Sequence, residues 1–277
     1  MPPALRPILN SVLCLAAIGA PLLAQETPAK GSGWTVTTGL SWSQTPNYAG
    51  SSEHTSKVAP FGLIDYKGVV GLGGSRSVDG FGLYVRPYKT EVLTLGLLAV
   101  QTGKREDDDA KALAGMGDRR ACFYLGAEAS LDLGLLQTSL EVMKGSRREA
   151  GWAAALEVSR SFPLGESLEL GLRTTGVWGD GTHQAWEFGI TPAQAAARRQ
   201  LLASGNTDLK ARDGQAYHPS SGLAQVRAGV SLNWQITGHL LSSASVDYIR
   251  LVGDAADSPL TRQKGQTVPS VALLYQF

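Results

Sequence analysis

The chain has 277 residues, and its net charge of +1 is close to neutral. A neutral chain offers no basic surface to phosphate groups, so the composition gives no support to a nucleic-acid partner. After the first 24 residues no apolar run approaches the ~18 residues that a membrane-spanning helix needs, which excludes a helical membrane protein.

Residues 1–24 have the features of a secretory signal peptide. One positive charge, Arg6, precedes an almost wholly apolar run from Val12 to Leu23, and Ala24 comes before polar residues. The run is too short and too weakly flanked for a spanning helix. We therefore predict an exported protein whose mature domain covers residues 25–277.

The two cysteines do not predict a disulfide framework. Cys14 lies inside the predicted signal peptide, and Val12 and Leu13 before it lack the small residue that a lipid-attachment site needs. Removal of the signal leaves Cys122 alone, so we expect no intramolecular disulfide in the mature chain.

The first mature segment, Trp34–Trp42, alternates without exception between large, mostly apolar residues and small or polar ones. A tryptophan at each end of a strand of about ten residues is typical of the apolar band of an outer-membrane barrel, which has an aromatic girdle at both interfaces. Taken singly, the same segment also suits a half-buried strand of a soluble sandwich.

The period of two recurs along the whole chain. A short strand near 69–76 brings the count to twelve, and single-chain bacterial barrels need an even number. The segment 91–101 is apolar on both faces, so its facing stays unassigned. The other segments lie near 58–66, 81–86, 123–132, 136–142, 152–159, 168–178, 224–236, 240–248 and 266–277.

Charged residues in the middle of these strands separate a barrel from a sandwich. They fall on the parity opposite to the apolar residues, where a sandwich would be dry, whereas a polar lumen tolerates them and lets them pair. These residues are Glu128, Glu141, Glu157, Glu169, Arg173, Arg227 and Asp247.

The connections alternate in length. Tight turns such as Lys67-Gly68 and Thr237-Gly238 separate longer polar loops such as 102–120 and 179–221, and the link Ser77–Asp79 is the exception. Short periplasmic turns and long extracellular loops are the rule in barrels. We predict an all-β, transmembrane antiparallel β-barrel of about 12 strands in the outer membrane, surrounded by lipid and lipopolysaccharide.

The loop 102–120 contains a mixed charge run, Lys104–Asp109. Such a run could bind cations or lipopolysaccharide phosphates, but a solvated loop is the simpler interpretation.

The loop 179–221 contains a predicted helix. Thr191 suits an N-cap, Pro192 the first helical position and Gln194 the second half of a capping box, while Gly205 ends the helix. The helix could plug the barrel mouth or lie over it, and the sequence does not decide between the two.

The stretch Gly253–Pro259 carries two carboxylates, Asp254 and Asp257, which makes a calcium site conceivable. It lacks the further alternating oxygen ligands and the bidentate acid of a calcium loop. A turn fixed by aspartate side chains and stopped by Pro259 is the better interpretation.

The final strand, 266–277, ends on an aromatic residue. Tyr275 and Phe277 lie on its apolar parity and resemble the assembly signal that the bacterial barrel assembly machinery reads. We therefore expect this machinery to be a partner and the strand to close the barrel.

No catalytic, metal-binding or cofactor-binding pattern emerges. His54, His183, His218 and His239 lie in different loops or at strand ends, and no serine stands in a G-x-S-x-G elbow. A histidine and a serine on neighbouring strands could still form a lipase-like pair. We predict a non-enzymatic protein without cofactors.

The loop sequences resemble the MipA/OmpV family of outer-membrane proteins over essentially the whole mature chain. The most specific stretch is Leu251–Pro259, with Gly253, Asp254, Asp257, Ser258 and Pro259. The segment Ala197–Ala203 is longer than is usual in the family. The other matching segments are Pro46–Ser51, Gly115–Asp118, Phe188–Thr191, Ala193–Ala195, Gly222-Leu223 and Tyr275–Phe277.

The resemblance implies a Gram-negative outer-membrane barrel and a scaffolding role that tethers a lytic transglycosylase to a bifunctional penicillin-binding protein during peptidoglycan synthesis. Other members are associated with adhesion or with osmotic or antibiotic responses. The family has no agreed catalytic or binding residues to carry over. A partner would have to bind the periplasmic rim or the leader Gln25–Ser32. A small-solute channel and, less favoured, a surface lipid hydrolase are the alternatives.

Overall fold

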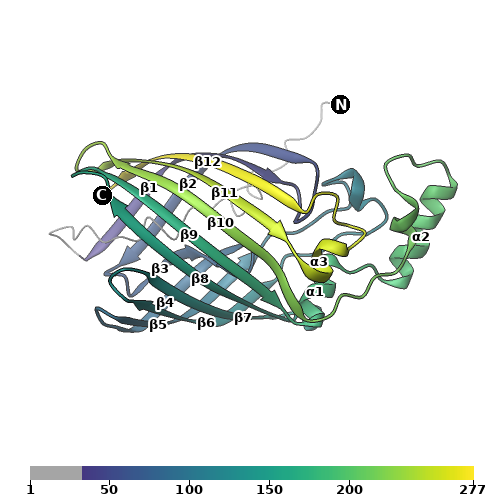
Figure 1. Ribbon diagram of the computed structural model, residues 1–277, viewed down its shortest axis with the longest axis horizontal. Helices are drawn as coiled ribbons and strands as arrows, with labels where there is room; N and C mark the ends of the chain where they lie inside the picture. The colour runs from purple at the N-terminus through teal and green to yellow at the C-terminus, as the bar shows by residue number, and fades with distance from the viewer. Residues whose placement is uncertain (1–32) are drawn as a thin grey trace, which may run out of the picture.

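The computed structural model describes residues 33–277, and these form a closed barrel of twelve antiparallel strands (Figure 1). Each strand pairs with its neighbours in the sequence, and β1 pairs with β12 to close the ring. The predicted fold class and strand number are confirmed. The predicted signal peptide, 1–24, and the leader, 25–32, lie outside the described residues. The strands are β1 (Trp34–Pro46), β2 (His54–Tyr66), β3 (Val70–Gly74), β4 (Gly80–Lys89), β5 (Leu93–Thr102), β6 (Phe123–Asp132), β7 (Gln137–Gly145), β8 (Trp152–Pro163), β9 (Leu168–Gly179), β10 (Gly222–Gln235), β11 (Leu240–Leu251) and β12 (Gly265–Gln276).

The outer wall is apolar because alternate residues of each strand point away from the lumen. Leu40 and Val58, for example, are 60% and 69% exposed, which a folded protein tolerates when lipid covers them. Trp34 contacts Tyr66 at the end of the short turns, with ring centroids 4.8 Å apart and the ring planes tilted by 48°. Trp152 begins β8 at the opposite end, so aromatic residues flank the apolar band on both sides.

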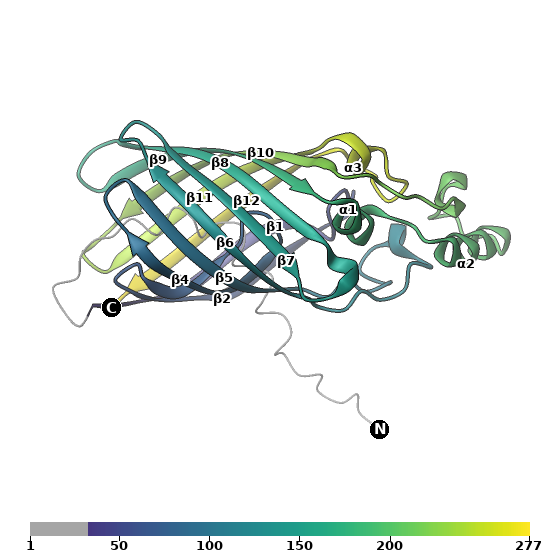
Figure 2. The same cartoon turned by 90° about the horizontal axis from the view of Figure 1, so that it is seen from below.

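The two ends of the barrel differ, as Figures 1 and 2 show. At one end the strands are joined by tight turns, such as the one in which Lys67 and Gly68 both adopt positive φ angles of 53° and 67°. These values suit the twisted two-residue hairpins of antiparallel sheets. At the other end the loops carry all the helices found in residues 33–277: η2 (Lys111–Leu113), η3 (Arg148–Ala150), α1 (Gly181–Phe188), α2 (Pro192–Ala203), η4 (Ala211–Gly214) and α3 (Gly253–Asp257).

Helix α2 begins and ends where the sequence predicts. The Thr191 hydroxyl accepts the backbone N–H of Gln194, and the Gln194 side chain accepts the N–H of Thr191, which completes the capping box. Gly205 follows the helix with a φ of 91°. The helix lies beyond the barrel end and does not enter it (Figure 1). No helix within residues 33–277 is long and apolar enough to cross a membrane.

The extracellular loops pack together into a cap over the barrel mouth. Its apolar core joins residues from four loops, among them Tyr48, Leu113, Ile190 and Leu260. The Tyr48 hydroxyl donates to the carbonyl of Leu260 at 2.7 Å. The cap therefore ties the first loop to the last.

An ion cluster fixes the outer part of the cap. The guanidinium groups of Arg198 and Arg262 both pair with the carboxylate of Asp213, which is fully buried together with Arg198. Arg198 also donates to the carbonyls of Ala112 and Ala114 at 3.1 Å. Three loops are joined at this point.

The pairing between β2 and β3 is short. β1 and β2 pair along their whole length, from Trp34 with Tyr66 to Pro46 with His54. β2 and β3 pair only through Asp65 with Gly71 and Tyr66 with Val70.

Candidate functional site

The connection between β3 and β4, residues Ser75–Asp79, enters the barrel instead of lying at its rim. We refer to these residues as the lumen hairpin. Ser75 and Ser77 are buried, and side chains of the hairpin contact inward-facing carboxylates of β6, β7 and β8. The hairpin therefore extends into the lumen and contacts the wall formed by β6, β7 and β8.

Glu141 of β7 holds the backbone of the lumen hairpin. Its carboxylate accepts the backbone N–H groups of Arg76 at 3.0 Å and Ser77 at 2.9 Å. The Ser77 hydroxyl donates at 2.5 Å, and the Ser75 hydroxyl also donates to it. A buried carboxylate needs several such charge-assisted bonds, because it would otherwise be expensive to remove from water. The carboxylate of Glu141 therefore fixes the shape of the hairpin.

Arg76 binds β6 and β8, the strands on either side of β7. Its Nη1 lies 3.1 Å from Oε2 of Glu128, and its Nε lies 3.1 Å from Oε1 of Glu157. Arg86 supplies a second cation to Glu128 at 2.7 Å, and Thr175 donates to Glu157 at 2.9 Å. In a buried network of this kind, removal of one partner typically costs about 3–5 kcal/mol because the remaining charge is left uncompensated.

Val78 anchors the lumen hairpin by apolar contact. It belongs to a buried cluster inside the barrel that includes Leu98, Val100, Tyr124 and Met143. The cluster explains why β5 is apolar on both faces: one face meets lipid, and the other packs against the hairpin.

The rest of the lumen also contains ion pairs. Arg173 and Asp247 form a two-pronged contact at 3.0 and 2.5 Å. Arg227 lies 3.6 Å from Asp79 of the lumen hairpin. The predicted inward parity of the strand charges is confirmed, since the lumen contains Glu128, Glu141, Glu157, Arg173, Arg227 and Asp247.

The sequence does not reveal the partner of these carboxylates. Arg76 was expected at the end of a short strand, and Ser77–Asp79 only as an unusually short link. The available signal was the break in loop alternation together with an arginine between two serines. Small hydroxyl residues beside an arginine suit a turn that must donate many hydrogen bonds in a confined space.

Helix α1 at the barrel mouth was not predicted, and two arginines bind its C-terminal end. Arg105 donates to the carbonyl of Glu187 at 3.1 Å, and Arg119 donates to that of Trp186 at 3.3 Å. Cations are stabilised at this end of a helix by its unpaired carbonyls. Burial and the neighbouring Arg119 lower the pKa of Arg105 to about 10.

The Glu187 side chain compensates these cations. Its carboxylate lies 2.6 Å from Nη1 of Arg119. Burial alone would raise the pKa of Glu187, but the attraction of Arg119, His183 and Arg105 outweighs it, so the pKa lies below its ordinary value.

The family-signature stretch forms α3 and the turn after it. Ser258 is fully buried, and its hydroxyl donates to the carbonyl of Phe188 at 2.6 Å and accepts the N–H of Leu260 at 3.2 Å. Gly253 has a φ of 53°, a left-handed conformation that favours glycine. Pro259 follows Ser258 where the helix has ended. This stretch therefore joins the last loop to α1 in the cap.

Asp254 and Asp257 do not act together. The carboxylate of Asp254 accepts the backbone N–H and the hydroxyl of Ser220, which lowers its pKa. Asp257 instead lies 3.0 Å from Nζ of Lys264. Separate partners favour the structural turn over the calcium site.

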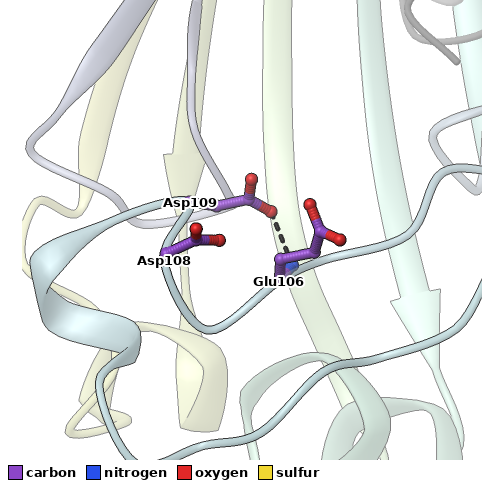
Figure 3. A group of neighbouring side chains, drawn as sticks. All are labelled: Glu106, Asp108 and Asp109. Carbon is purple, nitrogen blue, oxygen red and sulfur yellow. Dashed lines mark hydrogen bonds between the residues drawn. The ribbon is translucent and has the colours of Figure 1, made fainter. Parts of the chain in front are cut away.

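An acidic group occurs in the second long loop (Figure 3). Ligand atoms of Glu106, Asp108 and Asp109 lie within 4.8 Å of one another. The carboxylate of Asp109 already accepts the backbone N–H of Glu106 at 2.7 Å, and Lys104 pairs with Glu106 at 2.7 Å. The arrangement suits a solvated loop held by its own charges.

The histidines form no catalytic arrangement within residues 33–277. The Nδ1 atom of His183 lies 3.3 Å from the Tyr124 hydroxyl and 3.0 Å from the carbonyl of Ala150. Nδ1 of His239 lies 2.9 Å from the carbonyl of Gln276. Neither contact provides the nucleophile and base that a hydrolase needs.

The C-terminal aromatic residues lie at the end of the short turns. The rings of Tyr275 and Phe277 are 4.8 Å apart, and His239 stacks on Tyr275 at 5.7 Å. Recognition of this pair by the assembly machinery stays a prediction.

Comparison with known proteins identifies a family. The sequence model described as MltA-interacting protein MipA matches residues 38–277. No curated protein matches the chain.

Solved outer-membrane barrels resemble the chain at low identity. An outer-membrane channel from Pseudomonas putida F1 is 12% identical, with 91% of this chain and 98% of that chain covered and a TM-score of 0.42. The translocator domain of the autotransporter NalP from Neisseria meningitidis is 12% identical, with 90% of each chain covered and a TM-score of 0.43. OprB from Pseudomonas putida is 7% identical, with 88% and 94% covered and a TM-score of 0.42.

Proposed function

Because this chain belongs to the MltA-interacting protein MipA family, we propose that it is a non-conducting outer-membrane barrel that anchors a periplasmic partner protein. The lumen hairpin is the observation that carries the proposal. Arg76 and Val78 place an ion-pair network and an apolar cluster inside the lumen, which supports a barrel interior that serves stability and not transport.

The packed cap supports the same function. A channel needs an open mouth, whereas here the loops share a core around Leu113 and Leu260. A channel remains the second candidate because the exposed Asp79 and the partly exposed Arg227 place polar groups in the lumen.

The partner would bind at the periplasmic rim. The turns are short, but the turn between β6 and β7 projects Leu133 and Leu135, which are 62% and 68% exposed. Apolar side chains at the centre of a contact supply much of the binding energy of protein interfaces. The leader Gln25–Ser32 gives a second point of attachment.

The partner class follows from the family. The family is named for an interaction with MltA, and the resemblance implies a lytic transglycosylase together with a penicillin-binding protein as partners. The barrel would hold the peptidoglycan-cleaving enzyme at the membrane beside the synthase.

Two measurements test the proposal. Crosslinking in native outer membranes, followed by purification, is expected to recover the transglycosylase with the intact chain. Recovery should fall with the double variant Leu133→Ser/Leu135→Ser or with deletion of 25–32. The variant Ile236→Ser changes an apolar residue in a turn on another side of the barrel and should leave recovery unchanged.

Planar-bilayer recordings of the folded protein separate the two candidates. A non-conducting barrel gives no ion current above that of protein-free bilayers. Steady conductance, with unchanged enzyme recovery in the Leu133→Ser/Leu135→Ser variant, would favour the channel and reject the anchor.

A further inference from the structure

Most of β2 has a strand neighbour on one side only. Within residues 33–277, β3 pairs with β2 only at Asp65 and Tyr66, so residues 54–64 pair with β1 alone. At the rise of an extended strand, this is roughly 35 Å of unpaired edge. We refer to this edge and the facing part of β3 as the β2–β3 seam.

Pro60 lies where such an edge permits it. The N–H of Lys67 donates to the carbonyl of Gly33, so odd-numbered residues of β2 direct their backbone N–H and C=O groups toward β1 and even-numbered residues direct theirs away from it. Because these groups alternate along a strand, Pro60 directs its backbone toward the seam. Proline lacks the N–H that a neighbouring strand would require, and it is confined to edges in sheets.

Glycines make up most of β3, the other side of the seam. Three of the five residues of β3 are Gly71, Gly73 and Gly74. A methyl group built on Gly73 would meet only the ring of Tyr84, at 3.3 Å. Glycine in a strand often marks a place where a ligand or another backbone approaches closely.

The lumen hairpin keeps β3 away from β2. Glu141 binds the backbone of Arg76 and Ser77 directly after the end of β3. These residues are therefore directed into the barrel and cannot extend the pairing along β2. The contacts that hold the lumen hairpin inside the barrel therefore also leave the edge of β2 unpaired.

The surroundings of the seam are apolar. On the outer face Val58 and Ile64 are exposed to the lipid side. On the inner parity of β2 lie Ala59, Phe61 and Leu63, whereas most other strands turn serine, threonine or charged residues inward. An acyl chain suits such a surface because its methylene groups make van der Waals contact with the apolar side chains and leave no polar group unpaired.

A cation lies nearer the extracellular end of the same edge. Lys57 lies on the same inner parity as Phe61 and Leu63, it is exposed, and no residue of 33–277 lies within ion-pair or hydrogen-bond distance of its ammonium group. An unpaired lysine beside an apolar surface matches a lipid whose phosphate adjoins its chains. The ester carbonyls of a lipid would also accept bonds from the N–H groups of the edge, which cannot remain unpaired in hydrocarbon.

We propose that the β2–β3 seam binds one acyl chain of an outer-leaflet lipid against Phe61 and Leu63, with the lipid phosphate on Lys57. The seam then gives the barrel lateral access to the membrane. This inference does not depend on the periplasmic partner.

Photocrosslinking tests the acyl chain. Benzoylphenylalanine replaces Phe61 in protein folded into phosphatidylglycerol vesicles, and mass spectrometry detects adducts. The lipid-facing Val230 serves as the positive control, and Asn233, which faces the lumen on β10, as the negative control. Each variant must retain the gel-mobility shift on heating of a folded barrel.

We expect lipid adducts at positions 61 and 230 but not at 233. Labelling at 230 without any lipid adduct at 61 would overturn the proposal. An adduct of position 61 with a peptide, from this chain or another protein, would also overturn it, because the edge would then bind a strand.

The phosphate contact has its own test. In equimolar phosphatidylglycerol and phosphatidylcholine, position 61 should capture the anionic lipid several-fold in excess. Lys57→Gln should bring the ratio near one, whereas Lys264→Gln, a change of an exposed lysine in the last loop, should not. An unchanged ratio in Lys57→Gln would remove the phosphate from the proposal.

Discussion

Arg76 and Glu128 are separated by 52 positions in the chain, yet Nη1 of one lies 3.1 Å from Oε2 of the other inside the lumen. The contact joins the turn between β3 and β4 to β6, which lies two strands from β4 around the barrel. Both charges are largely removed from water, so each depends on the other for compensation.

Arg76→Ala is expected to open and destabilise the barrel interior. Glu128 and Glu157 would lose a shared cation, at a cost of about 3–5 kcal/mol. We expect a lower midpoint in thermal gel-shift assays and the appearance of ion current in planar bilayers. Arg148→Ala, a change of an exposed arginine in an extracellular turn, should alter neither measurement. An Arg76→Ala protein that keeps its thermal midpoint and carries no ion current would contradict the proposal that the lumen hairpin blocks the lumen.

Asp213→Asn is expected to loosen the cap and leave the barrel intact. Arg198 and Arg262 would remain buried without their carboxylate, and about 3–5 kcal/mol of local stability would be lost. Hydrogen exchange of 192–214 should then accelerate by ~10²-fold or more. As a control, Asp208→Asn lies in the same loop as Asp213 and breaks only an exposed pair with Lys111 of another loop, so it should change hydrogen exchange little.

The stability of α1 should depend on acid. The folded pKa of Glu187 lies below its ordinary value of 4.5, so its stabilising effect is fully present above about pH 4.5. The effect is lost as the pH falls through the lower folded pKa. Hydrogen exchange of 181–188, corrected for the intrinsic pH dependence, should show opening only in that acidic range. Glu187→Gln should exchange faster at neutral pH and match the parent protein in acid.

Ser258→Ala should weaken the attachment of the last loop to α1. The carbonyl of Phe188 and the N–H of Leu260 would lose their partner in a buried site, at a cost of about 1–3 kcal/mol. Trypsin should therefore cleave after Arg262 faster than in the parent protein. Asp257→Asn, which affects only an exposed pair, serves as the control. Equal cleavage rates in all three proteins would show that Ser258 does not fix this loop.

The barrel was predictable because lipid imposes one strict rule on every strand. Outward residues such as Leu40 and Val230 must be apolar, and the resulting period of two is visible without any knowledge of pairing. The capping box of α2 was predictable for a similar reason, since Thr191 and Gln194 satisfy each other within one turn.

The position of the lumen hairpin was not predictable because its contacts are distant in sequence and involve mainly backbone groups and hydroxyls. Glu141 binds mainly backbone N–H groups and hydroxyls, which any turn could offer, at positions 64 to 66 residues away. The facing of β5 was unassigned for the same reason: Leu98 and Val100 are apolar because Val78 covers them. Helix α1 contains glycine, threonine and histidine and is short, so propensity alone does not indicate it.

The bond from Tyr48 to Leu260 spans 212 positions of the chain and has a consequence for the order of folding. A contact between the first and last loops can form only after every intervening strand has found its place, and long-range closures of this kind are slow. The cap is therefore expected to fold last. The loops of a newly inserted chain should stay accessible to proteases until the barrel has closed.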